Sequence, residues 1–99
     1  MSQSLLKRRL VDVNERVKRM RAELAVTEEQ LTFLEEEAGD ARLRALVSET
    51  PLGEAEAREA RKHADAMGRQ RDALAHSIAA LLREQDDLLD RMAAELTTR

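Results

Sequence analysis

The sequence of 99 residues contains no cysteine, tryptophan or tyrosine, and Phe33 is its one aromatic residue. The absence of cysteine excludes disulfides and thiolate metal sites. β-Sheets are enriched in aromatic and β-branched residues, and their strands are separated by turns that contain glycine or proline. This chain has only three glycines and one proline. The missing residue types therefore argue against a sheet.

Long apolar runs are also missing. No segment approaches the roughly 18 apolar residues that span a bilayer, and residues 1–10 lack the apolar core of a signal peptide. We therefore expect a cytoplasmic protein without a membrane span. Arginine outnumbers lysine and alanine is abundant, which suggests a bacterial or phage source.

The residues that are present favour long helices. Ala, Leu, Glu and Arg dominate, and hydrophobic residues make up 42% of the chain and charged residues 37%. Such a composition is typical of coiled coils. The net charge of −3 is too small for a chain that is kept disordered by its charge. A chain of this length builds one domain at most, so we expect a single domain over residues 1–99.

Apolar residues recur in both halves of the chain at alternating intervals of four and three. In the first half they are Leu6, Leu10, Val13, Val17, Met20, Leu24, Thr27, Leu31, Leu34 and Ala38, with Thr27 as the polar member. In the second half they are Ala57, Ala60, Ala64, Met67, Arg71, Leu74, Ile78, Leu81, Gln85, Leu88 and Met92, with Arg71 and Gln85 as the polar members. This heptad spacing predicts two helices that each bury one seam against a partner helix.

The residues around position 50 predict a turn between these helices. Thr50 is suited to cap a helix N-terminus, and Pro51 to the first helical position, where a missing N–H costs nothing. We expect a first helix over about 4–47, a turn at 48–51 and a second helix over 51–97. Gly39 and Asp40 predict a kink or break in the first helix, although small residues at 41 and 45 would continue the seam beyond it.

Folding the chain back at this turn pairs the two heptad patterns. Residues whose numbers sum to 98 then share a layer, so that Leu10 meets Leu88 and Thr27 meets Arg71. Basic residues early in each helix then lie beside acidic residues late in the other, which favours the antiparallel pairing. The predicted fold is therefore all-α, an antiparallel two-helix coiled-coil hairpin.

Thr27 and Arg71 form a candidate register layer. In one interpretation the stem of Arg71 packs in the seam while its guanidinium reaches Glu28 or another carboxylate. In the other, the polar layer fixes the alignment of the helices at some cost in stability. The sequence leaves both interpretations open.

Residue types that bind metals or carry catalysis are present but scattered. His63 and His76 lie thirteen residues apart on one predicted helix, with no cysteine or third histidine to complete a site. Two paired helices offer no desolvated pocket for acid–base chemistry. The basic cluster from Lys7 to Arg21 would face acidic residues and has no aromatic residue for base stacking. We therefore expect no enzyme, no metal, no cofactor and no nucleic-acid partner.

Leucines recur every seven residues beside the seam of the second predicted helix. This leucine stripe consists of Leu82, Leu89 and Leu96. Val26 and Phe33 add a smaller apolar pair off the seam of the first predicted helix. Either the stems of Lys7 and Arg21 cover the leucines, or the stripe requires another helix. We expect the second case, with a homodimer that forms a four-helix bundle, or with another helical protein as the partner.

The predicted function is therefore protein–protein interaction, as a coiled-coil adaptor or structural protein. The alternative is a regulator whose hairpin tip inserts into a larger machine such as RNA polymerase. We define the hairpin tip as Leu43, Leu46, Val47, Glu49 and Leu52. In shape, such a hairpin resembles the Gre-type factors that enter the secondary channel of RNA polymerase. That family carries paired acidic residues at its tip, whereas Glu49 is the one acidic residue of this tip, so the partner and pathway stay open.

Overall fold

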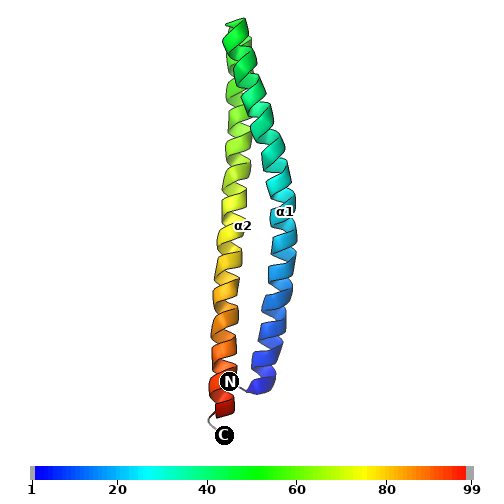
Figure 1. Ribbon diagram of the computed structural model, residues 1–99, viewed down its shortest axis with the longest axis vertical. Helices are drawn as coiled ribbons and strands as arrows, with labels where there is room; N and C mark the ends of the chain where they lie inside the picture. The colour runs from blue at the N-terminus through cyan, green and yellow to red at the C-terminus, as the bar shows by residue number, and fades with distance from the viewer. Residues whose placement is uncertain (1, 98–99) are drawn as a thin grey trace. The chain divides into compact units, whose positions relative to one another are not determined.

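The computed structural model describes residues 2–97, which form two α-helices, α1 (Gln3–Ser48) and α2 (Pro51–Thr97). The helices run in opposite directions and are joined by Glu49 and Thr50, as Figure 1 shows. The prediction of an all-α chain with two antiparallel helices is confirmed. The contacts divide the chain into two compact units, which we name the terminal unit (Met1–Glu23 with Leu74–Arg99) and the turn unit (Leu24–Ala73). That the chain acts as a single domain stays a prediction.

The terminal unit has a core of branched aliphatic side chains. Its buried cluster comprises Leu6, Val13, Val17, Leu81 and Leu88, with Leu10, Met20, Leu82 and Met92 packed against it. All of these residues except Leu82 belong to the two heptad patterns. A fully buried leucine or valine side chain contributes about 1.5–3 kcal/mol. Removal of these residues from water therefore holds α1 and α2 together in this unit.

The turn unit buries small side chains instead. Its buried alanines are Ala38, Ala41, Ala45, Ala57 and Ala64. Ala64 has no exposed surface and Ala45 is 1% exposed, while the larger Leu31, Leu34 and Met67 are only half-buried. Each alanine removes little apolar area from water. The packing of this unit therefore depends on a close fit between the helix backbones rather than on large side chains.

Of the kink or break predicted at Gly39 and Asp40, the break does not occur, because α1 continues through both residues to Ser48. A glycine within a helix costs about 1 kcal/mol relative to alanine. A break would cost more, because it would move Ala41 and Ala45 out of their buried cluster with Ala57 and would leave helical N–H and C=O groups unpaired. Tertiary packing therefore outweighs the local preference of this glycine.

The connection between the helices is fixed by features of Glu49, Thr50 and Gly53. Glu49 has a φ of 52°, in the left-handed region, and its N–H donates to the carbonyl of Ala45 at 3.0 Å. Thr50 then caps α2, because its hydroxyl accepts a hydrogen bond from the N–H of Gly53 at 3.0 Å. A Cβ added to Gly53 would lie 2.7 Å from the Ser48 hydroxyl oxygen. Gly53 therefore lets the end of α1 and the cap of α2 approach each other.

Replacing Glu49 by glycine should stabilise the protein, because glycine adopts a positive φ without the steric cost that glutamate incurs. We expect Glu49→Gly to raise the free energy of unfolding by about 0.5–1 kcal/mol, measured by urea denaturation. Glu56→Gly is the matched control, since Glu56 is an exposed residue inside α2, and it should lower the free energy of unfolding by a similar amount. Equal losses in both variants would show that the conformation of residue 49 carries no cost.

Candidate interaction surfaces

The leucine stripe lies in the terminal unit and is exposed along most of its length. Leu82 is half-buried against the core, but Leu89 is 47% exposed and Leu96 is 63% exposed. One interpretation of the sequence was that the stems of Lys7 and Arg21 cover the leucines. These exposures show that the stems do not cover the whole stripe. Two leucines remain in water on one helix, beside a well-packed seam.

A groove runs along the terminal unit next to this stripe. Its lining residues come from both helices and are Val11, Asn14, Glu15, Val17, Lys18, Arg21, Leu82 and Gln85. Gln85, a polar member of the seam, donates a hydrogen bond from its amide to the side-chain oxygen of Asn14. Val11 is 60% exposed at the surface. The groove therefore combines exposed apolar surface from α1 and α2 with the cations Lys18 and Arg21.

Polar contacts also link the two helices along the terminal unit. A guanidinium nitrogen of Arg9 lies 2.7 Å from a carboxylate oxygen of Glu84. The amide of Gln3 donates to the carbonyl of Met92 at 3.1 Å. The first contact joins a basic residue early in α1 to an acidic residue late in α2, as expected for antiparallel pairing. Both residues are partly exposed, so this pair contributes to orientation more than to stability.

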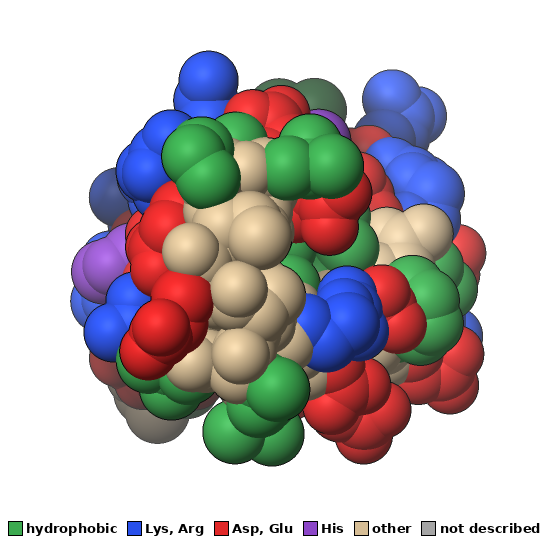
Figure 2. All heavy atoms as spheres, turned by 90° about the horizontal axis from the view of Figure 1, so that it is seen from above, with side chains coloured by type: hydrophobic (Ala, Val, Ile, Leu, Met, Phe, Trp, Pro, Cys, Tyr) green, Lys and Arg blue, Asp and Glu red, His purple; other side chains and the backbone are tan. Residues whose placement is uncertain are grey.

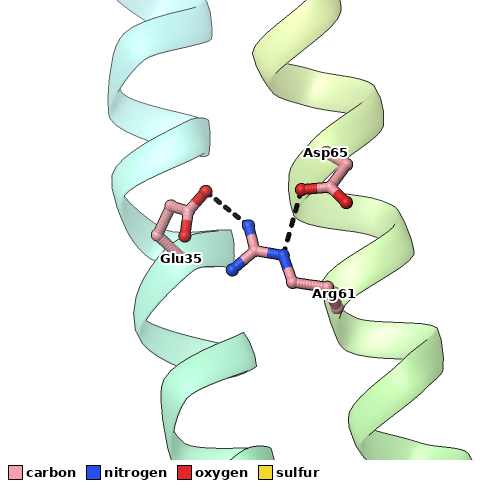
Figure 3. Close-up of polar contacts among 3 residues, drawn as sticks. All are labelled: Glu35, Arg61 and Asp65. Atoms are coloured by element: carbon pink, nitrogen blue, oxygen red, sulfur yellow. Dashed lines mark hydrogen bonds and ion pairs between the residues drawn. The ribbon is translucent and has the colours of Figure 1, made fainter.

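The turn unit carries a second groove, which is basic. Its lining includes Ala38, Gly39 and Ala57, the cations Arg42, Arg58, Arg61, Lys62 and Arg69, and the acidic residues Glu35, Glu54 and Asp65, so the cations are in excess. Figure 3 shows the Arg61 guanidinium between Glu35 of α1 and Asp65 of α2. Its nitrogens lie 2.6 Å from a carboxylate oxygen of Glu35 and 3.0 Å from one of Asp65. The hydrogen bond to Glu35 raises the pKa of Arg61 above its ordinary value. Arg61 thus joins the two helices by a polar contact where their buried side chains are small.

The apolar pair on α1 belongs to the turn unit as well. Val26 is 54% exposed and Phe33 is 60% exposed. Phe33 lines a shallow groove with the half-buried Leu34 and Met67. The structure thus assigns this pair and the leucine stripe to different units.

The hairpin tip exposes all of its predicted members. Val47 is 85% exposed and Leu52 is 69% exposed, and Leu43 and Leu46 are more than half exposed. Figure 2 views this end of the molecule, and the apolar side chains on the face it shows lie in separate groups between charged ones. The tip therefore offers apolar side chains, but that face has no continuous apolar patch.

The two members of the register layer have different environments. Thr27 is buried to 2% exposure, and it is the one buried polar residue among residues 2–97. Arg71 is half-buried, and its Nε donates to the carboxylate of the adjacent Asp72 at 2.7 Å. The guanidinium of Arg71 therefore reaches a carboxylate, as in the first interpretation of the sequence, and this carboxylate is that of Asp72.

The acidic and histidine side chains of the described residues are not grouped in a way that would bind a metal. Within residues 2–97, no three His, Asp or Glu side chains lie close enough together to hold a metal ion. His63 lies 3.2 Å from Glu59 on the exposed side of α2 and would form an ion pair with it when protonated. Within the same range, neither helix has a stretch long and apolar enough to cross a membrane.

Comparison with known proteins returns no relative. No protein-family model matches the sequence, and no curated protein or solved structure matches the chain. A functional proposal must therefore start from the chain's own surfaces.

Proposed function

We propose that this protein is a non-enzymatic protein–protein interaction module that binds through the leucine stripe. One observation supports the proposal above the others: Leu89 and Leu96 remain 47% and 63% exposed beside a buried heptad seam. Aligned leucines at the surface of a helix are typical of a site that another protein covers. The half-buried Leu82 extends this surface to the core of the terminal unit.

Burial of the stripe favours association. Each leucine contributes about 1.5–3 kcal/mol when it is fully buried, and a twofold-symmetric dimer buries the stripe of each chain. Association costs about 4–15 kcal/mol in lost translational and rotational freedom. Because Leu82 is already half-buried and Leu89 and Leu96 start at 47% and 63% exposed, two stripes recover only part of that energy, and the adjoining Val11 adds apolar area.

The finer form of the proposal is a homodimer in which two antiparallel coiled-coil hairpins make a four-helix bundle. Another helical protein is the other partner that fits the stripe. In either case the chain acts as an adaptor or structural protein in the bacterial cytoplasm. The proposal includes no catalytic residue, metal or cofactor, and it assigns Thr27 and Arg71 the role of fixing the register of the helices.

Replacing leucines of the stripe by glutamate tests the proposal. We expect the wild type to sediment at equilibrium with the mass of two chains at micromolar concentration. The variant Leu82→Glu with Leu89→Glu should have the mass of one chain, because burial of two carboxylates opposes association. The matched control is Leu43→Glu with Leu46→Glu, on exposed leucines of the hairpin tip, which should leave the mass unchanged.

The second candidate function is a regulator whose hairpin tip enters a cleft of a larger machine such as RNA polymerase. The 85% exposure of Val47 and the 69% exposure of Leu52 favour it. Partners co-purified from the native host would distinguish the two functions. A partner that is lost on changing Leu46 and Val47 to serine, but kept on changing the leucine stripe, would favour the tip over the stripe.

A further inference from the structure

The leucine stripe is part of a second heptad pattern on α2. Intervals of four and three connect Ala75, Ala79, Leu82, Asp86, Leu89, Ala93 and Leu96. Asp86 is the one polar member of this second seam. Ala79 and Leu82 are half-buried, and the other members are exposed. Because α2 already buries its first seam in the hairpin, the second seam is available to an additional helix.

Two carboxylates mark the second seam. Asp86 follows Leu82 by four residues and precedes Leu89 by three, and Asp90 follows Asp86 by four, so all lie on one side of α2. Neither Asp86 nor Asp90 forms an ion pair with another residue in the range 2–97, whereas the neighbouring Asp87 pairs with Arg91 at 3.2 Å. The second seam, with the adjacent Asp90, therefore combines apolar surface with two carboxylates that lack a cationic partner within the described chain.

The groove beside the second seam has a net positive charge, because its lining includes Lys18 and Arg21 but only one carboxylate, Glu15. Lys18 and Arg21 line it together with Val11 and Leu82. Lys18 has one ion pair, to Glu15 of the same helix at 3.8 Å, and both side chains are highly exposed. Arg21 pairs with no other residue in the range 2–97. One surface of the terminal unit thus holds an apolar seam with carboxylates on α2 and a basic rim with an exposed valine on α1.

We propose that the partner of this surface is a second copy of the chain, with the second seam of each α2 seated in the α1 groove of the other copy. The inference rests on the proposed function and names its partner and geometry. A twofold axis makes each contact occur twice, so that a surface can bind its own copy only if it is self-complementary. This surface meets that condition: Asp86 and Asp90 of one copy face Lys18 and Arg21 of the other, and the leucines meet Val11.

Direct pairing of the two stripes is the less favourable geometry. The members of the second seam are centred close to Asp86, so antiparallel packing of α2 on its copy would place the two Asp86 carboxylates together. Parallel packing about a twofold axis would also place Asp86 against Asp86. Like charges placed together at an interface cost several kcal/mol. Seating α2 on the α1 of the other copy replaces this repulsion by attraction to Lys18.

A charge exchange tests the geometry. One variant carries Asp86→Lys with Asp90→Lys, and a second carries Lys18→Glu with Arg21→Glu; all four residues are exposed. Each variant alone should dimerise at least ~10-fold more weakly than the wild type, because both halves of its interface then repel. An equimolar mixture should recover the wild-type affinity, because the heterodimer has attractive pairs in both halves. Native mass spectrometry identifies the heterodimer, and circular dichroism checks that each variant keeps its helices.

The outcomes separate this inference from the proposed function. If both variants dimerise like the wild type while Leu82→Glu with Leu89→Glu is a monomer, the stripe binds but the geometry proposed here is wrong. If the wild type is itself a monomer, the second copy is excluded and another helical protein is left as the partner of the stripe. Weakened variants that fail to recover in the mixture would also overturn the proposed contacts between α2 and the α1 of the other copy.

Discussion

Leu88→Ala should lower the free energy of unfolding by about 2–5 kcal/mol, because it removes a leucine side chain from a packed core. Leu88 is 3% exposed and packs with Leu6, Val13, Val17 and Leu81, so little of the resulting space can be refilled. A protein of this size has a total stability of roughly 5–15 kcal/mol, so the loss is a large fraction of it. Urea denaturation measures the change, with the helical circular dichroism signal followed as the protein unfolds.

The matched control for Leu88 is Leu5→Ala. Leu5 belongs to the same unit but is 51% exposed, so its truncation should change the free energy of unfolding by less than about 0.5 kcal/mol. Equal losses in the two variants would mean that burial in the heptad seam does not determine the stability of the terminal unit.

Ala64→Leu should destabilise the protein by about 1–3 kcal/mol, although it adds a hydrophobic side chain at a seam position. Ala64 has 0% exposure, so the three added carbon atoms must displace side chains that already pack around it. The larger side chain must either take a strained rotamer or separate α1 from α2 in the turn unit. Thermal unfolding followed by circular dichroism should show a lower Tm than for the wild type.

Ala66→Leu is the control for this substitution. Ala66 lies two residues further along α2 and is exposed. Alanine and leucine have similar helix propensities, so this variant should keep the wild-type Tm. A Tm that is unchanged or raised in Ala64→Leu would show that the turn unit can widen without loss of packing.

Much of the fold could be predicted because two independent signals agree. The heptad spacing identifies Leu6 and Leu88 as seam positions, and they are 1% and 3% exposed. The Thr50-Pro51 pair marks the start of α2, where the Thr50 hydroxyl accepts from the N–H of Gly53. A heptad repeat over several helical turns still predicts a helix when single positions depart from the pattern. A capping residue followed by proline is typical of a helix N-terminus.

The helix break predicted at Gly39 does not occur, and this has a physical reason. Helix propensity acts locally and is weak, about 1 kcal/mol for a glycine. The packing that opposes a break comes from Ala57 and Ala60 of α2, which lie far away in the sequence. A local signal therefore predicts a break that the tertiary contacts prevent. The positive φ of Glu49 was missed for a similar reason, since glutamate gives no signal for the left-handed region.

The candidate surface was predicted in part. The seven-residue interval identified the leucine stripe, and the structure shows Leu89 and Leu96 exposed. Val11 was missed, because it follows the seam residue Leu10 and does not recur with a partner seven residues away. Its position beside Leu82 depends on side chains from two helices. The layer numbering aligns the two helix backbones. It does not determine which residue of the other helix a long side chain such as that of Arg9 contacts.

The alanines of the turn unit and the leucines of the terminal unit imply opposite limits on sequence drift. In the terminal unit, exchanges among leucine, isoleucine and methionine keep the apolar volume roughly constant and are tolerated best. At Ala45 and Ala64, which are 1% and 0% exposed, only serine or glycine is small enough to replace alanine. In a lineage that keeps this hairpin, mutations that shrink a side chain are therefore selected against in the terminal unit, and mutations that enlarge one are selected against in the turn unit.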